Sequence, residues 1–213
     1  MNEPETRESR ITVVNAIVAV NLVVFLLWLS PIAPIEAMVG HFLVSWPHLA
    51  DGRVWVLLTS VFSHNLLLHL AINMIVLLSF GPPLEQLMGG RRFLVFYLVA
   101  GLLASISHLA VSGLLIDRPE QPALGASGAI AALLILFSFT FPKARILLFF
   151  IVPMPAIVGA LGFVAIDIWG LFAQIEGGGL PIGHGAHLGG ALTGFLYFLV
   201  RGRSLRRRGM IVR

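Results

Sequence analysis

Long apolar stretches without charged residues constrain the fold of this chain more than any other feature. Such stretches recur at 11–30, 66–84, 93–116, 123–141, 146–166 (extending toward 172) and 185–200. A helix needs about 20 apolar residues to cross the hydrocarbon core of a bilayer. Only 11% of the 213 residues are charged, against roughly 25% in soluble domains. The pattern predicts an all-α polytopic membrane protein with six membrane-spanning helices.

Basic residues divide unevenly between the two sides of such a bundle. If the N-terminus is inside, the inner side holds twelve Lys and Arg, and the outer side holds only Arg53 and Arg118. Because positive residues favour the cytoplasmic side, we expect both termini in the cytoplasm. The chain then divides into a short tail at 1–10, a six-span domain at 11–200 and a basic tail at 201–213. That basic cluster follows an apolar segment, so we expect it to face lipid headgroups and not nucleic acid.

Two glycine-framed motifs each place one reactive side chain inside an apolar segment. Ser127 lies in Gly-Ala-Ser-Gly at 125–128, and His187 lies in Gly-Ala-His-Leu-Gly-Gly at 185–190. A serine with a histidine forms the minimal pair of nucleophile and general base, and an ionisable residue in a span favours a functional role. Two alternatives remain: the small residues only let helices pack, or His187 bonds a backbone carbonyl or lies at the wet interface.

The topology predicts that these polar side chains lie at one depth. The second, fourth and sixth spans all run from outside to inside, and Ser127, His187, His69 and Asn73 lie a few residues into them. We therefore expect all four near the outer face. Small residues could bring the serine and the histidine together. The expected contact pairs Gly190 and Gly194 of the sixth span with small residues of the fourth: Gly128, Ala131 and Ala132.

His69 and Asn73 are spaced four residues apart and so share one face of the second span. Both can donate hydrogen bonds to a developing oxyanion; the alternative is polar contact between helices. His64 lies near the water boundary, and we interpret it as an interfacial residue.

In this order the motifs resemble the rhomboid family of intramembrane serine proteases, over nearly the whole chain. The resemblance is carried by His69, Asn73, Gly81, Glu85, Gly89, residues 125–128, Ala186, His187 and Gly190. It implies the six-span bacterial form, with Ser127 as nucleophile and His187 as base in a dyad that requires no acid. It also implies an oxyanion site of His69, Asn73 and the Ser127 N–H. The implied partners are the lipid bilayer and single-span transmembrane substrates cut near a small residue.

Two positions depart from the common pattern of that family. Trp55 is followed by Val56 where an arginine is frequent, which questions how the first loop is anchored. Ala131 stands four residues after the serine, where many members carry a tyrosine that stacks on the histidine. We therefore expect helix packing or another partner to orient His187.

Other ionisable residues lie in or beside the predicted spans, among them Asp167, Glu85 and His184. We expect Asp167, near the outer end of the fifth span, to face water or to cap a neighbouring group; the alternative is that it orients His187 as in a triad. Glu85 is interpreted as structural. His184 and His187 could be read as two metal ligands, but no His-Glu-x-x-His motif occurs. We expect neither a metal site nor a cofactor.

The fifth span and its flanks suggest how substrate and water would enter. Pro153 and Pro155 predict a kinked, loosely held helix, and the glycine-rich loop at 177–181 is typical of a lid. By resemblance these are the gate and the cap. The first loop, 31–53, is the longest connection, and its apolar and aromatic residues predict an interfacial segment.

Two other functions remain open at this stage. One is a catalytically silent rhomboid-like protein that binds membrane clients. The other is a small transporter with His69, Asn73, His108 and Asp167 along a polar path, although we find no internal repeat. Because the chain is short and shows no targeting extension, we expect a bacterial plasma membrane, with the active site toward its outer face.

Overall fold

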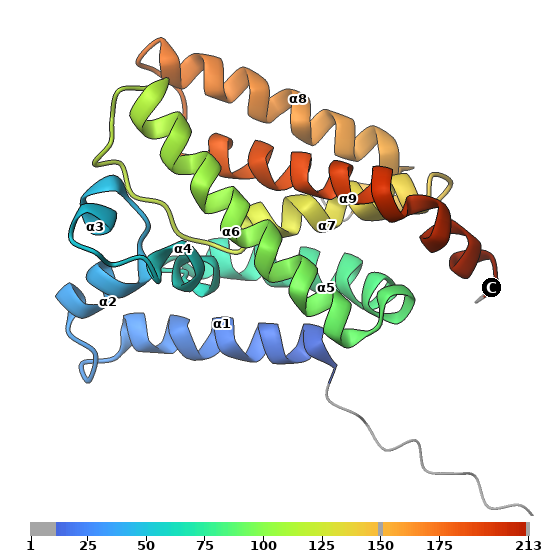
Figure 1. The fold of residues 1–213 in the computed structure, drawn as a ribbon, viewed down its shortest axis with the longest axis horizontal. Helices are drawn as coiled ribbons and strands as arrows, with labels where there is room; N and C mark the ends of the chain where they lie inside the picture. The colour runs from blue at the N-terminus through green and yellow to red at the C-terminus, as the bar shows by residue number, and fades with distance from the viewer. Residues whose placement is uncertain (1–11, 149–150, 212–213) are drawn as a thin grey trace, which may run out of the picture.

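A helical bundle forms the body of the protein. The computed structural model describes residues 12–148 and 151–211, and most of them are helical. The long helices are α1 (Val13–Leu29), α5 (Leu67–Met88), α6 (Gly90–Leu114), α7 (Ser127–Thr140), α8 (Ala156–Ile175) and α9 (His184–Ile211). Figure 1 shows α8 at the edge of the bundle beside α9, with the start of α1 and the end of α9 at the same end. The prediction of a mostly helical protein is confirmed.

The long helices differ in how far they could reach across a bilayer. By length and composition α5, α6 and α8 are long and apolar enough to cross a membrane. The apolar helices α1 and α7 are shorter, at 17 and 14 residues. Helix α9 has 28 residues and carries arginines toward its C-terminal end. At about 1.5 Å per residue, α7 covers only part of a hydrocarbon core about 30 Å thick.

The fifth predicted helix begins later than the sequence suggested. Residues Arg145–Leu148 (β1) and Val152–Pro155 (β2) pair as an antiparallel hairpin, and α8 starts only at Ala156. The prediction of a helix from 146 is therefore wrong over this stretch. Pro153 and Pro155 explain it, because proline lacks an N–H and holds the residue before it in extended conformation.

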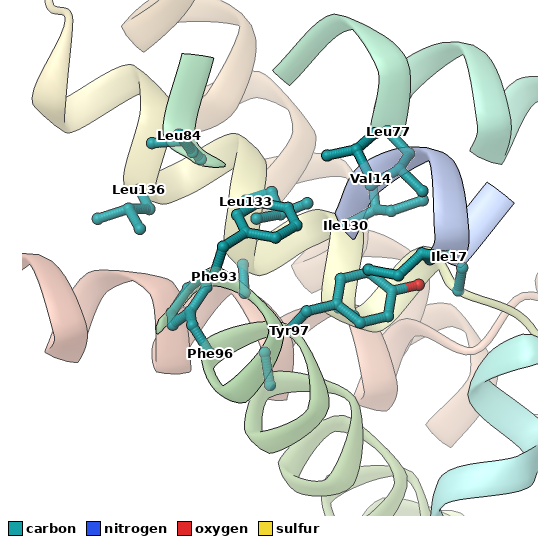
Figure 2. Packing of buried hydrophobic residues seen from close by; sticks show 14 of the residues in the cluster. Val14, Ile17, Leu77, Leu84, Phe93, Phe96, Tyr97, Ile130, Leu133 and Leu136 are labelled. Atoms are coloured by element: carbon teal, nitrogen blue, oxygen red, sulfur yellow. The ribbon is translucent and has the colours of Figure 1, made fainter. Parts of the chain in front are cut away.

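The main apolar core lies between α1, α5, α6 and α7. Figure 2 shows one residue from each helix packed together: Val14, Leu77, Tyr97 and Leu133. All four are fully buried. Glu85 joins two of these helices, because its carboxylate accepts the N–H groups of Val13 and Val14 at 2.8 and 2.9 Å. Those groups begin α1 and have no intrahelical acceptor, which is consistent with a structural role for Glu85.

Helices α7 and α9 approach through their small residues. A β-carbon built on Gly190 would overlap the carbonyl oxygen of Gly128, and one built on Gly194 would overlap that of Ala132. Both pairs advance by four residues in the same direction, so the two helices run parallel. The structure thus brings together the small residues that the sequence pattern paired, and it places the N-terminal ends of α7 and α9 side by side.

The first connection consists of short helices that are tied to the bundle. It contains α2 (Ile35–Phe42), α3 (Trp46–Ala50), α4 (Val56–Thr59) and the 3₁₀ turn η1 (Ser60–Phe62). The Trp46 Nε1–H donates to the Leu109 carbonyl at 2.8 Å, and Val44 pairs with Ala123 as an isolated β-bridge. Val56, the departure from the family pattern, is fully buried. Anchoring of this loop therefore uses Trp46 and the bridge.

The two predicted tails differ in what the structure describes. The predicted tail at 1–10 lies outside the described residues. Within 201–213, α9 continues as a helix to Ile211. There the Arg206 guanidinium donates to the Phe139 carbonyl at the end of α7, with Nη2 at 2.8 Å.

Candidate active site

Ser127 is the first residue of α7, and the loop before it is held on both sides. Gly125 has a φ of +123°, a conformation that favours glycine. Its N–H donates to the Ser60 carbonyl at 2.9 Å, and the Ala126 N–H lies 3.4 Å from Nε2 of His64. These contacts fix the turn that presents the Ser127 hydroxyl.

The Ser127 hydroxyl and the His187 imidazole form a hydrogen bond between α7 and α9. Ser127 Oγ lies 2.8 Å from His187 Nε2. For the hydroxyl to donate, Nε2 must be unprotonated, so the neutral ring carries its hydrogen on Nδ1. This is the geometry of a nucleophile next to its general base.

Asp167 lies on the far side of the same imidazole. Its Oδ1 is 2.9 Å from His187 Nδ1, and the residue is only 3% exposed. The expectation that Asp167 faces water is therefore wrong, and the contact fits the alternative that Asp167 orients His187. The face of α8 that carries Asp167 packs against α9, which buries the carboxylate and completes a Ser–His–Asp arrangement.

His184 shares this carboxylate with His187. Its Nδ1 lies 2.6 Å from the same Oδ1 of Asp167, and its ring is buried. One potential ligand atom from each of Asp167, His184 and His187 lies within 4.8 Å of the others, a separation also compatible with a metal site. In the structure both Nδ1 atoms face Oδ1 directly, as hydrogen-bond donors to a carboxylate do.

Phe163 is the aromatic residue that lies beside the His187 ring, in a tilted arrangement. Its ring centroid lies 5.4 Å from that of His187, with an interplanar angle of 33°. Sequence reasoning missed this residue. A signal was present, because Phe163 precedes Asp167 by four residues and so shares its face of α8.

His69 and Asn73 line the same cavity as Ser127 and His187. The His69 ring lies against Gly125, where a β-carbon would come within 2.7 Å of it. The Asn73 amide donates one hydrogen to the His69 carbonyl at 2.9 Å, which leaves its second N–H for another acceptor. Both side chains thus lie on the serine side of the site.

His64 is a structural part of the site and not an interfacial residue. It is fully buried, and its ring meets that of His69 edge to face at 4.8 Å. Burial, and secondly the neighbouring His69, lower the pKa of His64 from its ordinary 6.5 to about 3. A neutral ring is required if Nε2 is to accept the Ala126 N–H. The prediction of an interfacial histidine is wrong because the ring is buried against His69 and the Ala126 N–H.

The cavity at the site has a volume of about 650 Å³ and a mostly apolar lining. Polar groups in its lining include Ser127, His187, His69, Asn73 and His108. Within the described part of the chain, Asp167 and His184 are not in that lining. A molecule that enters the cavity could therefore contact Ser127 and His187, whereas the Asp167 carboxylate lies behind the His187 ring.

Taken together, the helices and the site define a membrane-type helical protein in which a serine and a histidine line a cavity and a buried aspartate lies behind the histidine. A model of the rhomboid domain matches residues 51–204. The chain belongs to the rhomboid family, which confirms the resemblance seen in its motifs.

Curated relatives of similar sequence agree with this assignment. RHOMBOID-like protein 12, mitochondrial, of Arabidopsis thaliana is 34% identical over 191 residues, covering 84% of this chain and 55% of the relative. Rhomboid protein 1, mitochondrial, of Saccharomyces cerevisiae is 35% identical over 188 residues, covering 86% and 51%. Presenilin-associated rhomboid-like protein, mitochondrial, of Homo sapiens is 33% identical over 189 residues, covering 86% and 47%. The chain spans about half the length of these relatives.

The relatives correct the expected location. All three are named as mitochondrial proteins. They point to a mitochondrial membrane, and the prediction of a plasma-membrane protein is wrong on this comparison. The shortness of the chain and its N-terminal composition, on which that prediction rested, do not identify a membrane.

Proposed function

We propose that this protein is an intramembrane serine endopeptidase that cuts single-span membrane proteins in or near their transmembrane segments. The observation that carries the proposal is the 2.8 Å contact between Ser127 Oγ and His187 Nε2 at the lining of an open cavity. Membership of the rhomboid family supports the same reaction.

The proposed reaction is acyl transfer in two steps. His187 Nε2 takes the hydroxyl proton while Ser127 Oγ attacks the peptide carbonyl carbon. When the C–N bond breaks, the imidazolium returns the proton to the leaving amine. A water molecule then loses a proton to Nε2 and attacks the ester, which releases the carboxylic acid and restores the Ser127 hydroxyl.

The proposed oxyanion site consists of the Ser127 N–H, His69 and Asn73. Ser127 is the first residue of α7, so its N–H has no intrahelical acceptor and lies at the positive end of the helix dipole. His69 and Asn73 of α5 line the same cavity. Donors placed there would stabilise negative charge on the attacked carbonyl oxygen.

We also propose six membrane-spanning segments, with α1, α7 and α9 joining the three longer apolar helices. The start of α1 and the end of α9 share one end of the bundle, as an even number of crossings requires (Figure 1). Many large apolar residues on the outer faces of the bundle, such as Leu68 and Leu78, are exposed, so the bundle would lie in lipid. A substrate that reaches it there would be another membrane-embedded chain.

The transporter alternative has less support from the site. It requires His69, Asn73, His108 and Asp167 along one polar path, yet within the described residues Asp167 is absent from the cavity lining. A silent client-binding protein would share the fold, and only an activity measurement separates it from a protease.

Cleavage of a single-span reporter in lipid vesicles tests the proposed function. We expect the full chain to cut the reporter and Ser127→Ala to abolish cutting, because the nucleophile is lost. Ser79→Ala is the matched control, since Ser79 is an exposed serine that bonds only the Ile75 carbonyl within the described residues. Cutting that persists in Ser127→Ala, or an intact reporter with the unmodified protein, would refute the proposal.

A further inference from the structure

Both contacts that orient the base come from one helix, α8. Asp167 meets Nδ1 of the His187 ring at 2.9 Å, and the Phe163 ring lies beside it at a tilt, with centroids 5.4 Å apart. The two residues are one turn apart on α8 (Ala156–Ile175), while His187 lies on α9. The orientation of the general base is thus set from a neighbouring helix.

His184 fixes Asp167 from the other side. Its Nδ1 donates to the same Oδ1 at 2.6 Å, so one carboxylate oxygen joins two rings that lie one turn apart near the start of α9. The His184 ring lies against Gly170, where a β-carbon would overlap its Nε2 and Cε1 atoms. Helix α8 therefore approaches α9 closely at this point, and a side chain at 170 would prevent it.

Helix α8 is otherwise the least enclosed of the three longest apolar helices. Only 22% of its apolar window is buried, against 39% in α5 and 44% in α6. Its outer face exposes large side chains, among them Trp169 at 73% and Phe172 at 62%. In Figure 1 it lies at the edge of the bundle, against α9. Asp167 joins this helix to α9 through His184 and His187. Nearer its N-terminal end, Ala160 packs with Ile135 of α7 and Ala191 of α9.

We propose that Asp167, held by His184, is the positioning residue for His187, so that the base is productive only while α8 is docked on α9. This inference rests on the proposed protease function. The Asp167 carboxylate accepts the Nδ1–H, which leaves Nε2 free to receive the serine proton. It also stabilises the imidazolium that forms when that proton arrives. Asp167 lies outside the cavity lining, so it acts through His187 and not on the substrate.

Asp167→Asn separates positioning from substrate binding. We expect kcat for the vesicle reporter to fall about a hundredfold or more, because the uncharged amide neither enforces the Nδ1–H form nor balances the imidazolium. KM should stay within about threefold, because the cavity lining is intact. The rate at which a fluorophosphonate labels Ser127 should fall with kcat, and this second readout requires no peptide substrate.

A matched control on the same helix is Gln174→Met. Gln174 is buried on α8 and donates to the Leu180 and Ile182 carbonyls, both at 2.8 Å. Among the described residues no hydrogen bond joins it to Asp167 or His187. If Asp167 only joined the two helices, Asp167→Asn and Gln174→Met would lower the thermal unfolding midpoint and the activity in parallel. We expect Gln174→Met to lower the midpoint while leaving kcat within about threefold.

A variant at His184, the second partner of Asp167, serves if Asp167→Asn does not fold. His184→Leu leaves the Asp167–His187 contact in place and removes only the other donor, so we expect a loss in kcat of less than about tenfold. All assays are repeated with a chelator, because the same three side chains have metal-site separation. Activity that falls in the chelator would assign Asp167 to a metal site and overturn the inference.

The two proposals fail in distinguishable ways. If the unmodified protein cuts the reporter and Asp167→Asn retains activity within tenfold with normal stability, a Ser–His dyad suffices and this inference is wrong. If the unmodified protein neither cuts nor is labelled at Ser127, the protease function itself is wrong and the inference falls with it.

Discussion

The His187 ring illustrates how one residue can be oriented by neighbours that its own helix does not supply. Ser127 meets it from α7, while Asp167 and Phe163 meet it from α8. In many rhomboid sequences, by the resemblance above, a tyrosine four residues after the serine stacks on this histidine. Here that position is Ala131, which is 1% exposed and too small to stack. The same physical requirement is met from a different helix.

Moving the aromatic side chain from position 163 to position 131 tests whether either position can orient the His187 ring. We expect Phe163→Leu to lower kcat about threefold to tenfold, the value of an aromatic contact of 0.5–1.5 kcal/mol. Adding Ala131→Tyr to that variant should recover at least half of the lost activity, because both positions line the same cavity as His187. Reporter cleavage by the single and double variants measures the coupling. A double variant no better than Phe163→Leu would show that position 131 cannot replace Phe163.

The buried His64 makes stability depend on acid. In the unfolded chain its imidazole takes a proton below about pH 6.5, whereas in the folded protein its pKa is about 3. Between these values the unfolded state binds more protons, so the folded state loses stability as pH falls. We expect the thermal unfolding midpoint to fall from pH 6.5 toward pH 3, and His64→Gln to show a flatter dependence. Identical slopes for both proteins over this range would contradict the assignment.

At the scale of elements, the packing of α7 on α9 followed from sequence patterns, and the placement of α8 did not. Glycines spaced by four, Gly190 and Gly194, mark a flat helix face that can be read directly from the sequence. Asp167 could not be placed in this way. Whether a polar residue near a helix end faces water or a neighbour depends on helix rotation, which a uniformly apolar helix does not reveal. The sequence did not reveal the paired strands β1 and β2, because Pro153 and Pro155 are also compatible with a kink inside a helix.

Alanine at Gly190 tests the close contact between α7 and α9. Its β-carbon would overlap the Gly128 carbonyl, so the helices must separate; overpacking of this kind costs about 1–3 kcal/mol. We expect Gly190→Ala to lower the thermal unfolding midpoint and to slow labelling of Ser127, because Ser127 precedes Gly128. Gly162→Ala is the control, since nothing lies within 4 Å of its β-carbon. Equal effects of the two substitutions would contradict the packing described here.

At the scale of the whole molecule, the apolar helices and the ordered motifs were sufficient to predict a helical membrane protein of the rhomboid family. The family match over residues 51–204 confirms that membership. The location was predicted wrongly, since the named relatives are mitochondrial. A membrane-spanning sequence records the thickness and polarity of a bilayer, but different cellular membranes share those properties. The sequence also lacked any local signal for the burial of His64, because one of its partners, Ala126, is distant in the sequence.

The most direct measurement of the hydrolytic site is the rate at which a fluorophosphonate modifies Ser127 in vesicles, followed by mass mapping of the adduct. We expect the unmodified protein to react at Ser127, and His187→Asn to react at least about a hundredfold more slowly, because the hydroxyl then lacks its general base. An adduct that maps to another serine, or equal rates for the two proteins, would contradict a Ser127–His187 nucleophile and base.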